Sequence, residues 1–177
     1  MFKSTPLLSE ESIQNRVREI ADSLNRDYAG RTVDALCVLK GSMFFAADLF
    51  RNLTVPVRVH FMQVSSYGSS TESSGTVNLY FSSAFEVEDC DVLLVEDILD
   101  TGITMNYLLE RLRARNPRTM KTCVLLDKPA RRKLDIKADY VGFEIQDHFV
   151  VGYGLDYNEL GRNMRHIAII DPAAHEE

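Results

Sequence analysis

A buried strand that runs into acidic residues and then turns directly into a helix is the feature that most constrains this chain. The segment from Val92 to Thr104 reads VLLVEDILDTGIT. Its first four residues are apolar, as in a strand buried on both faces, and a Thr-Gly-x-Thr turn then opens a helical pattern. Ligands of open α/β sheets bind at the carboxyl ends of such strands. The segment therefore predicts both a parallel sheet and the position of a binding site.

The polar groups of this segment suit a phosphorylated sugar. Backbone N–H groups at a helix start, with the hydroxyls of Thr101 and Thr104, form a cradle for a phosphate monoester. Gly102 permits close approach of the backbone, and the upstream acids Glu96 and Asp97 could accept hydrogen bonds from sugar hydroxyls. The segment matches neither a Walker A loop nor GxGxxG. The alternative is a helix cap beside solvated acids, but Glu96, Asp97 and Asp100 would then repel one another without compensation.

The rest of the chain alternates helical and strand-like patterns, which is typical of an α/β fold with a largely parallel central sheet flanked by helices. Short strands in the last third indicate a small cap, or hood, beside that sheet. The polar segment 65–75 is the one low-complexity stretch and reads as a lid or a disordered connection. We expect helices over 9–30, 42–53 (capped by Ser42) and 103–115, strands over 33–39, 55–64, 76–81, 92–95, 121–126 and 166–170, and turns at Gly142, Gly152 and Gly154.

A length of 177 residues fits a single domain, residues 1–177, with a core of about 30–140 and a hood formed by about 141–177 plus the N-terminal residues. With 26 acidic and 20 basic residues the net charge is −6, which argues against a general nucleic-acid-binding surface.

The three cysteines form no CxxC pair, and Cys37 and Cys123 lie in apolar runs, so we expect free buried thiols. No signal-peptide pattern and no run of about 20 apolar residues is visible. We therefore expect a cytoplasmic protein without membrane contact.

The Val92–Thr104 segment resembles the phosphoribosyl-pyrophosphate (PRPP) motif of the type I phosphoribosyltransferases. The chain is similar, over nearly its whole length, to the hypoxanthine-guanine branch of that family. The matching pieces are Leu39-Lys40-Gly41-Ser42, Ser66-Tyr67-Gly68, Leu126-Asp127-Lys128-Pro129, the run VGFEI at 141–145 and the run FVVGYGLDYNE at 149–159. The resemblance implies the type I phosphoribosyltransferase fold and a homodimer or homotetramer.

The activity implied by the resemblance is purine salvage. A magnesium-dependent enzyme of this family transfers the 5-phosphoribosyl group of PRPP to hypoxanthine, and to guanine as an expected second substrate, giving IMP or GMP and pyrophosphate. Asp100 would be the general acid/base that faces N7 of the purine. The family likeness also implies that the Leu39–Lys40 peptide bond is cis. Contacts to PRPP are implied for Lys40, Gly41, Glu96, Asp97, Asp100, Thr101, Gly102, Ile103, Thr104 and Arg162.

The remaining implied roles concern the metal, the base and the lid. Mg²⁺ would be held by Asp156, with Glu96 and Asp97 near a second ion, because magnesium prefers oxygen ligands and often takes one or two carboxylates plus phosphate. Lys128 would donate to O6 of a 6-oxopurine, since an ammonium group has donors and no acceptor. The base would stack on Phe149 and meet the backbone carbonyl of Val150 at its 2-position. A lid over PRPP would include Ser66 and Tyr67.

Three other functions remain as alternatives. The first is a regulator that keeps the PRPP fold as a sensor and binds nucleic acid, for which Arg111–Arg118 is the best candidate basic patch. The second is a purely structural partner protein, which the acidic motif makes hard to explain. The third is a sibling enzyme that prefers xanthine or a pyrimidine, against which Lys128 and the run at 149–159 count. The sequence leaves the preference between hypoxanthine and guanine open.

Overall fold

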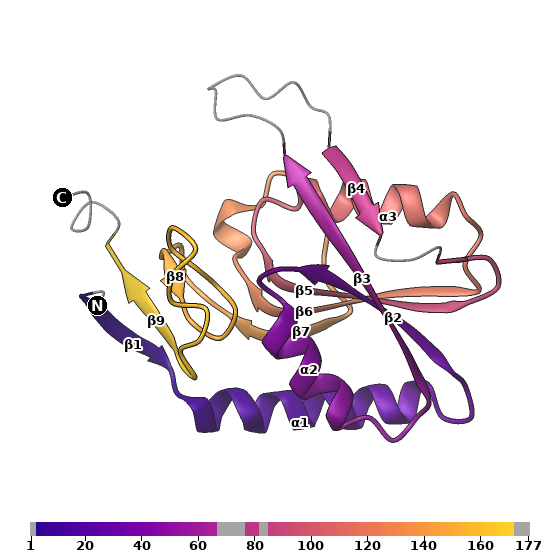
Figure 1. Ribbon diagram of the computed structural model, residues 1–177, viewed down its shortest axis with the longest axis horizontal. Helices are drawn as coiled ribbons and strands as arrows, with labels where there is room; N and C mark the ends of the chain where they lie inside the picture. The colour runs from indigo at the N-terminus through magenta and orange to yellow at the C-terminus, as the bar shows by residue number, and fades with distance from the viewer. Residues whose placement is uncertain (1–2, 67–76, 82–84, 172–177) are drawn as a thin grey trace.

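The computed structural model describes residues 3–66, 77–81 and 85–171, and these form a central sheet with helices on both faces (Figure 1). The strand order of this six-stranded sheet is β4-β3-β2-β5-β6-β7. All neighbouring pairs are parallel except β3 with β4. The α/β fold predicted from the sequence is therefore confirmed. The strands are β2 (Val33–Leu39), β3 (Val57–Ser66), β4 (Val77–Phe81), β5 (Asp91–Leu99), β6 (Thr119–Asp127) and β7 (Tyr140–Glu144).

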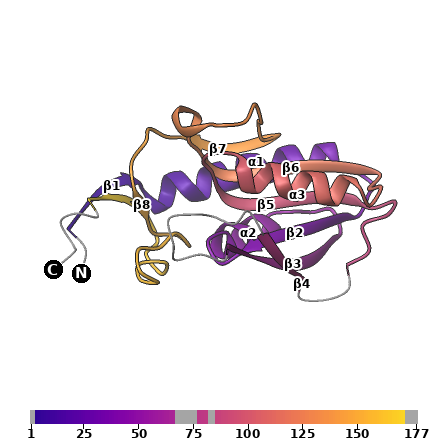
Figure 2. The same cartoon turned by 90° about the horizontal axis from the view of Figure 1, so that it is seen from above.

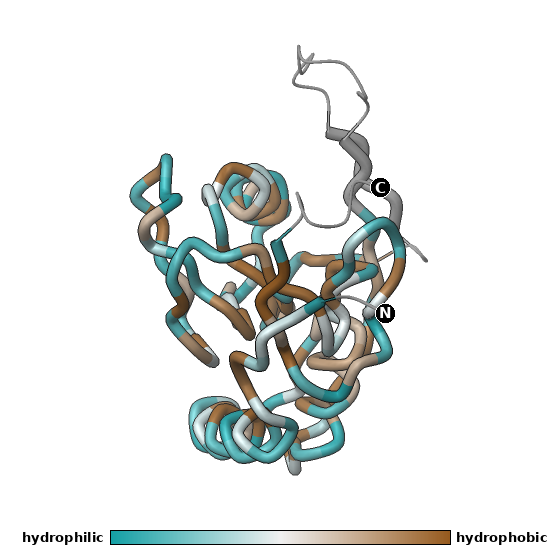
Figure 3. The backbone as a smooth tube through the Cα atoms, turned by 90° about the vertical axis from the view of Figure 1, so that its left-hand side faces the viewer, coloured by the Kyte–Doolittle hydropathy of each residue, from teal (hydrophilic) through white to brown (hydrophobic). Residues whose placement is uncertain are grey.

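Among the described residues, α1 (Glu10–Asp27) and α2 (Met43–Arg51) cover one face of the sheet and α3 (Ile103–Arg113) covers the other (Figure 1). Alternate residues of the central strands feed the two hydrophobic cores. Val95 packs with α1 and α2, whereas Leu94 packs with α3. In Figure 3 the hydrophobic segments accordingly gather in the middle of the molecule. None of the helices described is long and apolar enough to cross a membrane.

Two serines were predicted to cap helices, and the structure confirms only one of them. Ser9 caps α1 as predicted, because its side chain accepts a hydrogen bond from the Ser12 amide at 3.1 Å. Ser42, by contrast, makes no capping hydrogen bond to α2, so that part of the prediction is wrong. Its hydroxyl donates to the carbonyl oxygen of Val38 at 2.5 Å and lies 3.0 Å from Cys37 Sγ. Ser42 is fully buried, and it therefore ties the turn back to the end of β2.

A second, three-stranded antiparallel sheet stands at one end of the molecule, beside the start of α1 (Figures 1 and 2). Its strands are β1 (Ser4–Leu8), β9 (Ile167–Ile170) and β8 (Val150–Val151).

The turn expected at Gly142 does not exist, because this residue lies inside β7. A Cβ atom at Gly142 would come within 2.3 Å of the Leu125 carbonyl oxygen, so a glycine is required here for close packing against β6. Gly152 and Gly154 do lie at turns, with φ of +109° and +105°.

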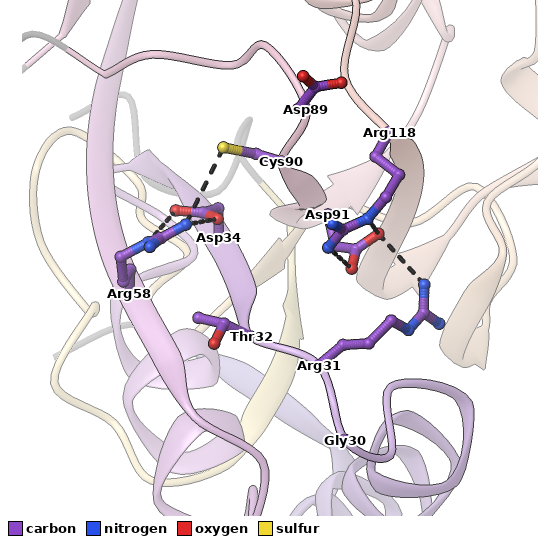
Figure 4. A pocket seen from close by; sticks show the side chains of 9 residues that line it. All are labelled: Gly30, Arg31, Thr32, Asp34, Arg58, Asp89, Cys90, Asp91 and Arg118. Carbon is purple, nitrogen blue, oxygen red and sulfur yellow. Dashed lines mark hydrogen bonds and ion pairs between the residues drawn. The ribbon is translucent and has the colours of Figure 1, made fainter.

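The amino-terminal edge of the central sheet holds a cavity of about 580 Å³ that is built from ion pairs (Figure 4). The carboxylate of Asp91 accepts hydrogen bonds from Arg118, from Arg31 at 3.2 Å and from the Thr119 hydroxyl at 2.7 Å. Asp34 is paired in the same way with Arg58, with N–O distances of 2.7 and 2.6 Å. The arginines already neutralise the two buried carboxylates. We therefore interpret the ion pairs around this cavity as a structural network that joins neighbouring strands.

Asp91 should contribute measurably to stability through this network. The hydrogen bonds from Arg118 hold the pKa of Asp91 below its usual value of 3.8. A carboxyl group with a lowered pKa in the folded state stabilises the protein at pH values above its unfolded-state pKa. This contribution is lost as the pH falls through the folded-state pKa. Asp91→Asn is expected to lower the free energy of unfolding by about 2 kcal/mol at pH 7. The expected loss is smaller than for a fully buried ion pair, because the two arginine partners are partly exposed and solvent weakens their attraction. Urea unfolding measures the loss, which should shrink as the pH is lowered below about 4.

Asp89→Asn is the matched control for this prediction. Asp89 lines the same cavity but is exposed, and an asparagine is well suited to its φ of +56°. We expect this change to stay within about 0.5 kcal/mol of the unaltered chain. Equal effects of the two substitutions would show that the buried ion pairs of Asp91 carry no special stability.

Candidate functional site

A second cavity, of about 190 Å³, lies at the opposite, carboxyl-terminal edge of the sheet. The sequence predicted a strand ending at Val95, but β5 continues to Leu99, so Glu96 and Asp97 belong to the strand itself. The carboxyl ends of open parallel sheets are where ligands bind, which makes this smaller cavity the candidate site. It is lined by Glu96, Asp97, Ile98, Leu99, Asp100, Thr101, Gly102, Thr104 and Met105.

The turn after β5 forms a cup at the start of α3. Gly102 has a φ of +83°, and a Cβ atom there would lie 2.5 Å from Ile136 Cγ2. The amide of Ile103 donates to Thr101 Oγ1 at 3.4 Å, and the first amide of α3 that donates to a backbone carbonyl is that of Asn106, to Gly102 at 2.9 Å, since a helix leaves its first amides without an intrahelical acceptor. Ile103 and Thr104 are exposed. The predicted cup residues are thus contiguous around one helix start, which suits an anion.

Glu96 and Asp97 are two neighbouring carboxyl groups in a poorly solvated position. Burial raises the pKa of Glu96 to about 8, and the neighbouring charge of Asp97 adds to this shift. Burial likewise raises the pKa of Asp97 to about 6, against the hydrogen bond from the Ile98 amide. Within the described part of the chain, no group of three or more His, Cys, Asp or Glu side chains could hold a metal alone. The two carboxylates nevertheless fit a divalent ion that takes its remaining oxygens from substrate and water.

The loop after β2 meets the acidic end of β5. The Leu39–Lys40 peptide bond is cis, as the family resemblance implied. A Cβ atom on Gly41 would lie 1.6 Å from Asp97 Oδ2, and one on Gly154 would lie 1.9 Å from the carbonyl oxygen of Gly41. At Gly154 the close atom is backbone and φ is +105°, so only a glycine fits, whereas a side chain at Gly41 would displace the carboxylate of Asp97. Gly41 is therefore packed between the carboxylate of Asp97 and the backbone of the segment that follows β8.

A charged cluster surrounds this contact, and it contains one residue that the sequence reasoning did not select. Arg162 Nη2 lies 2.7 Å from Asp156 Oδ1, and Arg162 Nη1 donates to the Gly154 carbonyl at 2.8 Å. Lys40 Nζ donates to Glu159 Oε2 at 2.9 Å, which holds the pKa of Glu159 below its usual value. Lys40, Asp156 and Arg162 are thus brought together, and Glu159 joins them.

Asp100 lies on the other side of the β5 end. Its Oδ1 is buried without a hydrogen bond to any described residue, but it forms an ion pair with Arg131 Nε at 3.2 Å. Arg131 also lies 3.6 Å from Asp147. In the sequence Arg131 stands in a short basic run with Arg132 and Lys133. Its contact with Asp100 joins segments that are far apart in the sequence, so no local pattern could have identified it.

The three residues predicted for a purine base lie on segments next to Asp100. Lys128 is 5% exposed, its Nζ donates to the carbonyl of His148 at 2.6 Å, and its amide donates to the Leu99 carbonyl at 2.9 Å. Burial lowers the pKa of its ammonium group. Phe149 keeps 45% of its surface exposed and meets Tyr157 edge-on at 5.7 Å, so it offers an aromatic surface for stacking. Val150 is buried in β8.

The lid residues are largely beyond what the structure describes. Tyr67 lies outside the described residues, and only the backbone of Ser66 is placed, at the end of β3 opposite Val77. The prediction of a lid over the site therefore stays a prediction.

Comparison with known proteins gives a consistent result. A family model described as "Phosphoribosyl transferase domain" matches residues 6–158. The chain is 48% identical to the hypoxanthine-guanine phosphoribosyltransferase of Bacillus subtilis, over 96% of this chain and 94% of that protein. It superimposes with a TM-score of 0.89 on a crystal structure of a Bacillus anthracis hypoxanthine-guanine phosphoribosyltransferase, at 42% identity, covering 97% and 100% of the two chains. A Trypanosoma cruzi hypoxanthine phosphoribosyl transferase gives a TM-score of 0.91 at 42% identity, with 99% and 95% covered.

Proposed function

The chain belongs to the phosphoribosyl transferase family, and from this premise we propose that it is a purine salvage enzyme that transfers the 5-phosphoribosyl group of PRPP to hypoxanthine and guanine. The products are IMP or GMP and pyrophosphate. One observation carries the proposal. The end of β5 places Asp97 against Gly41 on one side and Asp100 beside the Arg131 and Lys128 segment on the other. The residues proposed for the pyrophosphate, the sugar phosphate and the base are thereby adjacent.

The reaction displaces pyrophosphate from C1 of the ribose by a purine ring nitrogen. Its transition state has oxocarbenium character at the sugar and growing negative charge on the departing pyrophosphate, so the enzyme must stabilise an anion and orient a base. The cup at Thr101–Thr104 holds the 5-phosphate on backbone amides and hydroxyls. Lys40, Gly41 and Arg162 meet the pyrophosphate. Glu96 and Asp97 accept hydrogen bonds from the ribose hydroxyls.

The purine is held on the opposite side of C1. Asp100 exchanges a proton with N7 of the base, and Arg131 orients its carboxylate. The ammonium group of Lys128 has three N–H donors, and one of them is bound to the His148 carbonyl. Lys128 donates to O6 of the base with one of the other two. Phe149 stacks on the ring, and the Val150 carbonyl meets the 2-position.

Magnesium is the cofactor in this proposal, held by Asp156 with Glu96 and Asp97 as further carboxylates. When bound, Mg²⁺ neutralises charge on the phosphate oxygens. The raised pKa values of Glu96 and Asp97 support the assignment, because burial disfavours the ionised carboxylates and a bound cation would favour them. Arg162 holds Asp156 in the ligand-free chain.

Assembly, location and domain organisation complete the proposal. Met43 and Phe44 of α2 and Val59 and Phe61 of β3 are exposed apolar residues that support a homodimer or homotetramer. The free cysteines Cys37, Cys90 and Cys123 fit a reducing cytoplasm. The small sheet formed by β1, β8 and β9 would be the hood of a single domain over residues 1–177, with the lid at Ser66 and Tyr67 closing over PRPP.

A steady-state assay with PRPP, Mg²⁺ and four bases tests the proposal. Hypoxanthine and guanine should give their nucleotides and pyrophosphate, whereas xanthine and adenine should react far more slowly. A chelator should abolish the reaction, and added Mg²⁺ should restore it. Turnover of xanthine in preference to hypoxanthine would favour the sibling enzyme, and the absence of any nucleotide product would reject the proposal. A nucleic-acid-binding regulator has weak support, because Arg118 of the arginine-rich stretch is bound to Asp91.

Lys128→Ala should weaken the recognition of the 6-oxo group. We expect kcat/KM for hypoxanthine to fall by about 10- to 100-fold, and the ratio of hypoxanthine to adenine turnover to fall with it, because a lost charged hydrogen bond costs about 1.5–3 kcal/mol. Lys133→Ala is the control, since Lys133 is exposed on the segment after Arg132. If Lys128→Ala left both the hypoxanthine kinetics and the discrimination unchanged, the O6 assignment would be wrong.

A further inference from the structure

The carboxylate of Glu159 lies between the two cations that the proposed function gives to pyrophosphate. Its Oε2 accepts a hydrogen bond from Lys40 Nζ at 2.9 Å and another from Arg162 Nη2 at 3.4 Å. A single oxygen atom therefore contacts both cations, which is the arrangement that an oxygen of a bound pyrophosphate would make.

The backbone turn around Glu159 is held in place by its own hydrogen bonds. Asn158 and Glu159 have φ values of +50° and +64°, a conformation that non-glycine residues rarely adopt. The turn is closed by two hydrogen bonds of 3.0 Å between the backbones of Tyr157 and Leu160. The amide of Glu159 donates to Asp156 Oδ2 at 2.9 Å. The start of this side chain is thus fixed beside Asp156, and its carboxylate reaches the two cations.

We propose that Glu159 is a built-in competitor of pyrophosphate, which occupies Lys40 and Arg162 in the empty site and gives them up when the ligand binds. The inference rests on the proposed function, which assigns these two cations to pyrophosphate. The Glu159 side chain is 66% exposed, so its carboxylate can leave for water at little cost. Pyrophosphate carries more negative charge than one carboxylate and displaces it.

Competition of this kind has a consequence for turnover. The carboxylate returns to the cations as pyrophosphate departs, so it makes product release easier at the expense of affinity. It also keeps the side chains of Lys40 and Arg162 near each other in the absence of ligand. Because the hydrogen bonds of Glu159 go to Lys40, Asp156 and Arg162, its effect should be confined to ligands that carry pyrophosphate.

Glu159→Gln tests the proposal, because glutamine keeps the length of the side chain and removes its charge. Isothermal titration calorimetry with inorganic pyrophosphate and Mg²⁺ should give a Kd about two- to fivefold lower for Glu159→Gln than for the unaltered enzyme, as expected for the loss of an exposed ion pair. The KM for hypoxanthine should not change. Glu88→Gln is the matched control, because Glu88 is exposed in the loop before β5, at the opposite edge of the sheet, and the substitution changes the net charge equally.

An unchanged or higher Kd for Glu159→Gln, relative to Glu88→Gln, would overturn the proposal. The unaltered enzyme separates this failure from failure of the proposed function. If it forms IMP and binds pyrophosphate while Glu159→Gln binds no more tightly, only the role of Glu159 is wrong. If it does neither, the proposed function fails and the role of Glu159 fails with it.

Discussion

Replacing Asp100 with alanine is expected to lower kcat for IMP formation by about 10²–10⁴-fold, the usual contribution of a general acid/base. Asp100 is the carboxylate of the β5 turn that lies beside Arg131, with one buried oxygen that makes no hydrogen bond to the described residues. In the proposed mechanism the carboxylate of Asp100, oriented by Arg131, takes a proton from the base. The KM for PRPP should stay within a few-fold, because the cup and the pyrophosphate loop are built from other residues. Initial rates at saturating PRPP and hypoxanthine measure the effect.

Two further variants separate proton transfer from a loss of local order. Asp100→Asn keeps the shape of the side chain and should be as slow as the alanine variant. Asp147→Asn removes the other carboxylate near Arg131, which is exposed, and should leave kcat nearly unchanged. If Asp100→Ala retained normal turnover, Asp100 would have no part in the chemistry.

Glu96→Gln should make the protein more stable and at the same time less active. Burial raises the pKa of this carboxyl to about 8. A raised carboxyl pKa means that stability is complete below the unfolded value near 4.5 and is lost as the pH rises toward about 8. We expect the free energy of unfolding at pH 8 to rise by about 2 kcal/mol in Glu96→Gln, with the gain disappearing near pH 4.5.

The loss of activity has a separate origin, because Glu96 is proposed to hold a ribose hydroxyl. A lost hydrogen bond to a charged group costs about 1.5–3 kcal/mol, so kcat/KM for PRPP should fall by about 10- to 100-fold. Urea unfolding at several pH values and steady-state kinetics measure the two effects. Glu88→Gln should change neither quantity. Equal stability of Glu96→Gln and the unaltered chain at pH 8 would show that this carboxylate is already compensated in the empty site.

Most of the fold could be predicted from the sequence, because its central elements carry strong local signals. Four apolar residues followed by acids and a Thr-Gly turn indicated β5, the cup and the start of α3. The apolar spacing after Ser9 indicated α1. Gly142 was misread as a turn, since a glycine needed for close packing between strands looks the same in sequence as one needed for a bend.

The candidate site could be predicted only as far as contiguous motifs and the family resemblance reached. Arg131 and Glu159 were not predicted as site residues, because each joins the site through an ion pair with a distant segment. Charged surface residues are common, so the sequence alone does not show which of them form such pairs. Ser42 was wrongly assigned as a cap for a different reason, because both of its possible partners are close in the sequence. Its hydroxyl had a local option at the helix and a better one at the buried end of β2.

In the proposed function, the close packing of Gly41 between Asp97 and Gly154 makes PRPP binding depend on the folding of the whole chain. The three residues come from three distant regions of the sequence, so a nascent chain that lacks the region around Gly154 has an unfinished pyrophosphate loop. No partly folded form should therefore hold PRPP well. A ligand that binds only the finished fold shifts the folding equilibrium by mass action. The substrate would then protect the enzyme against thermal unfolding and against proteolysis, increasingly as its concentration rises above its Kd.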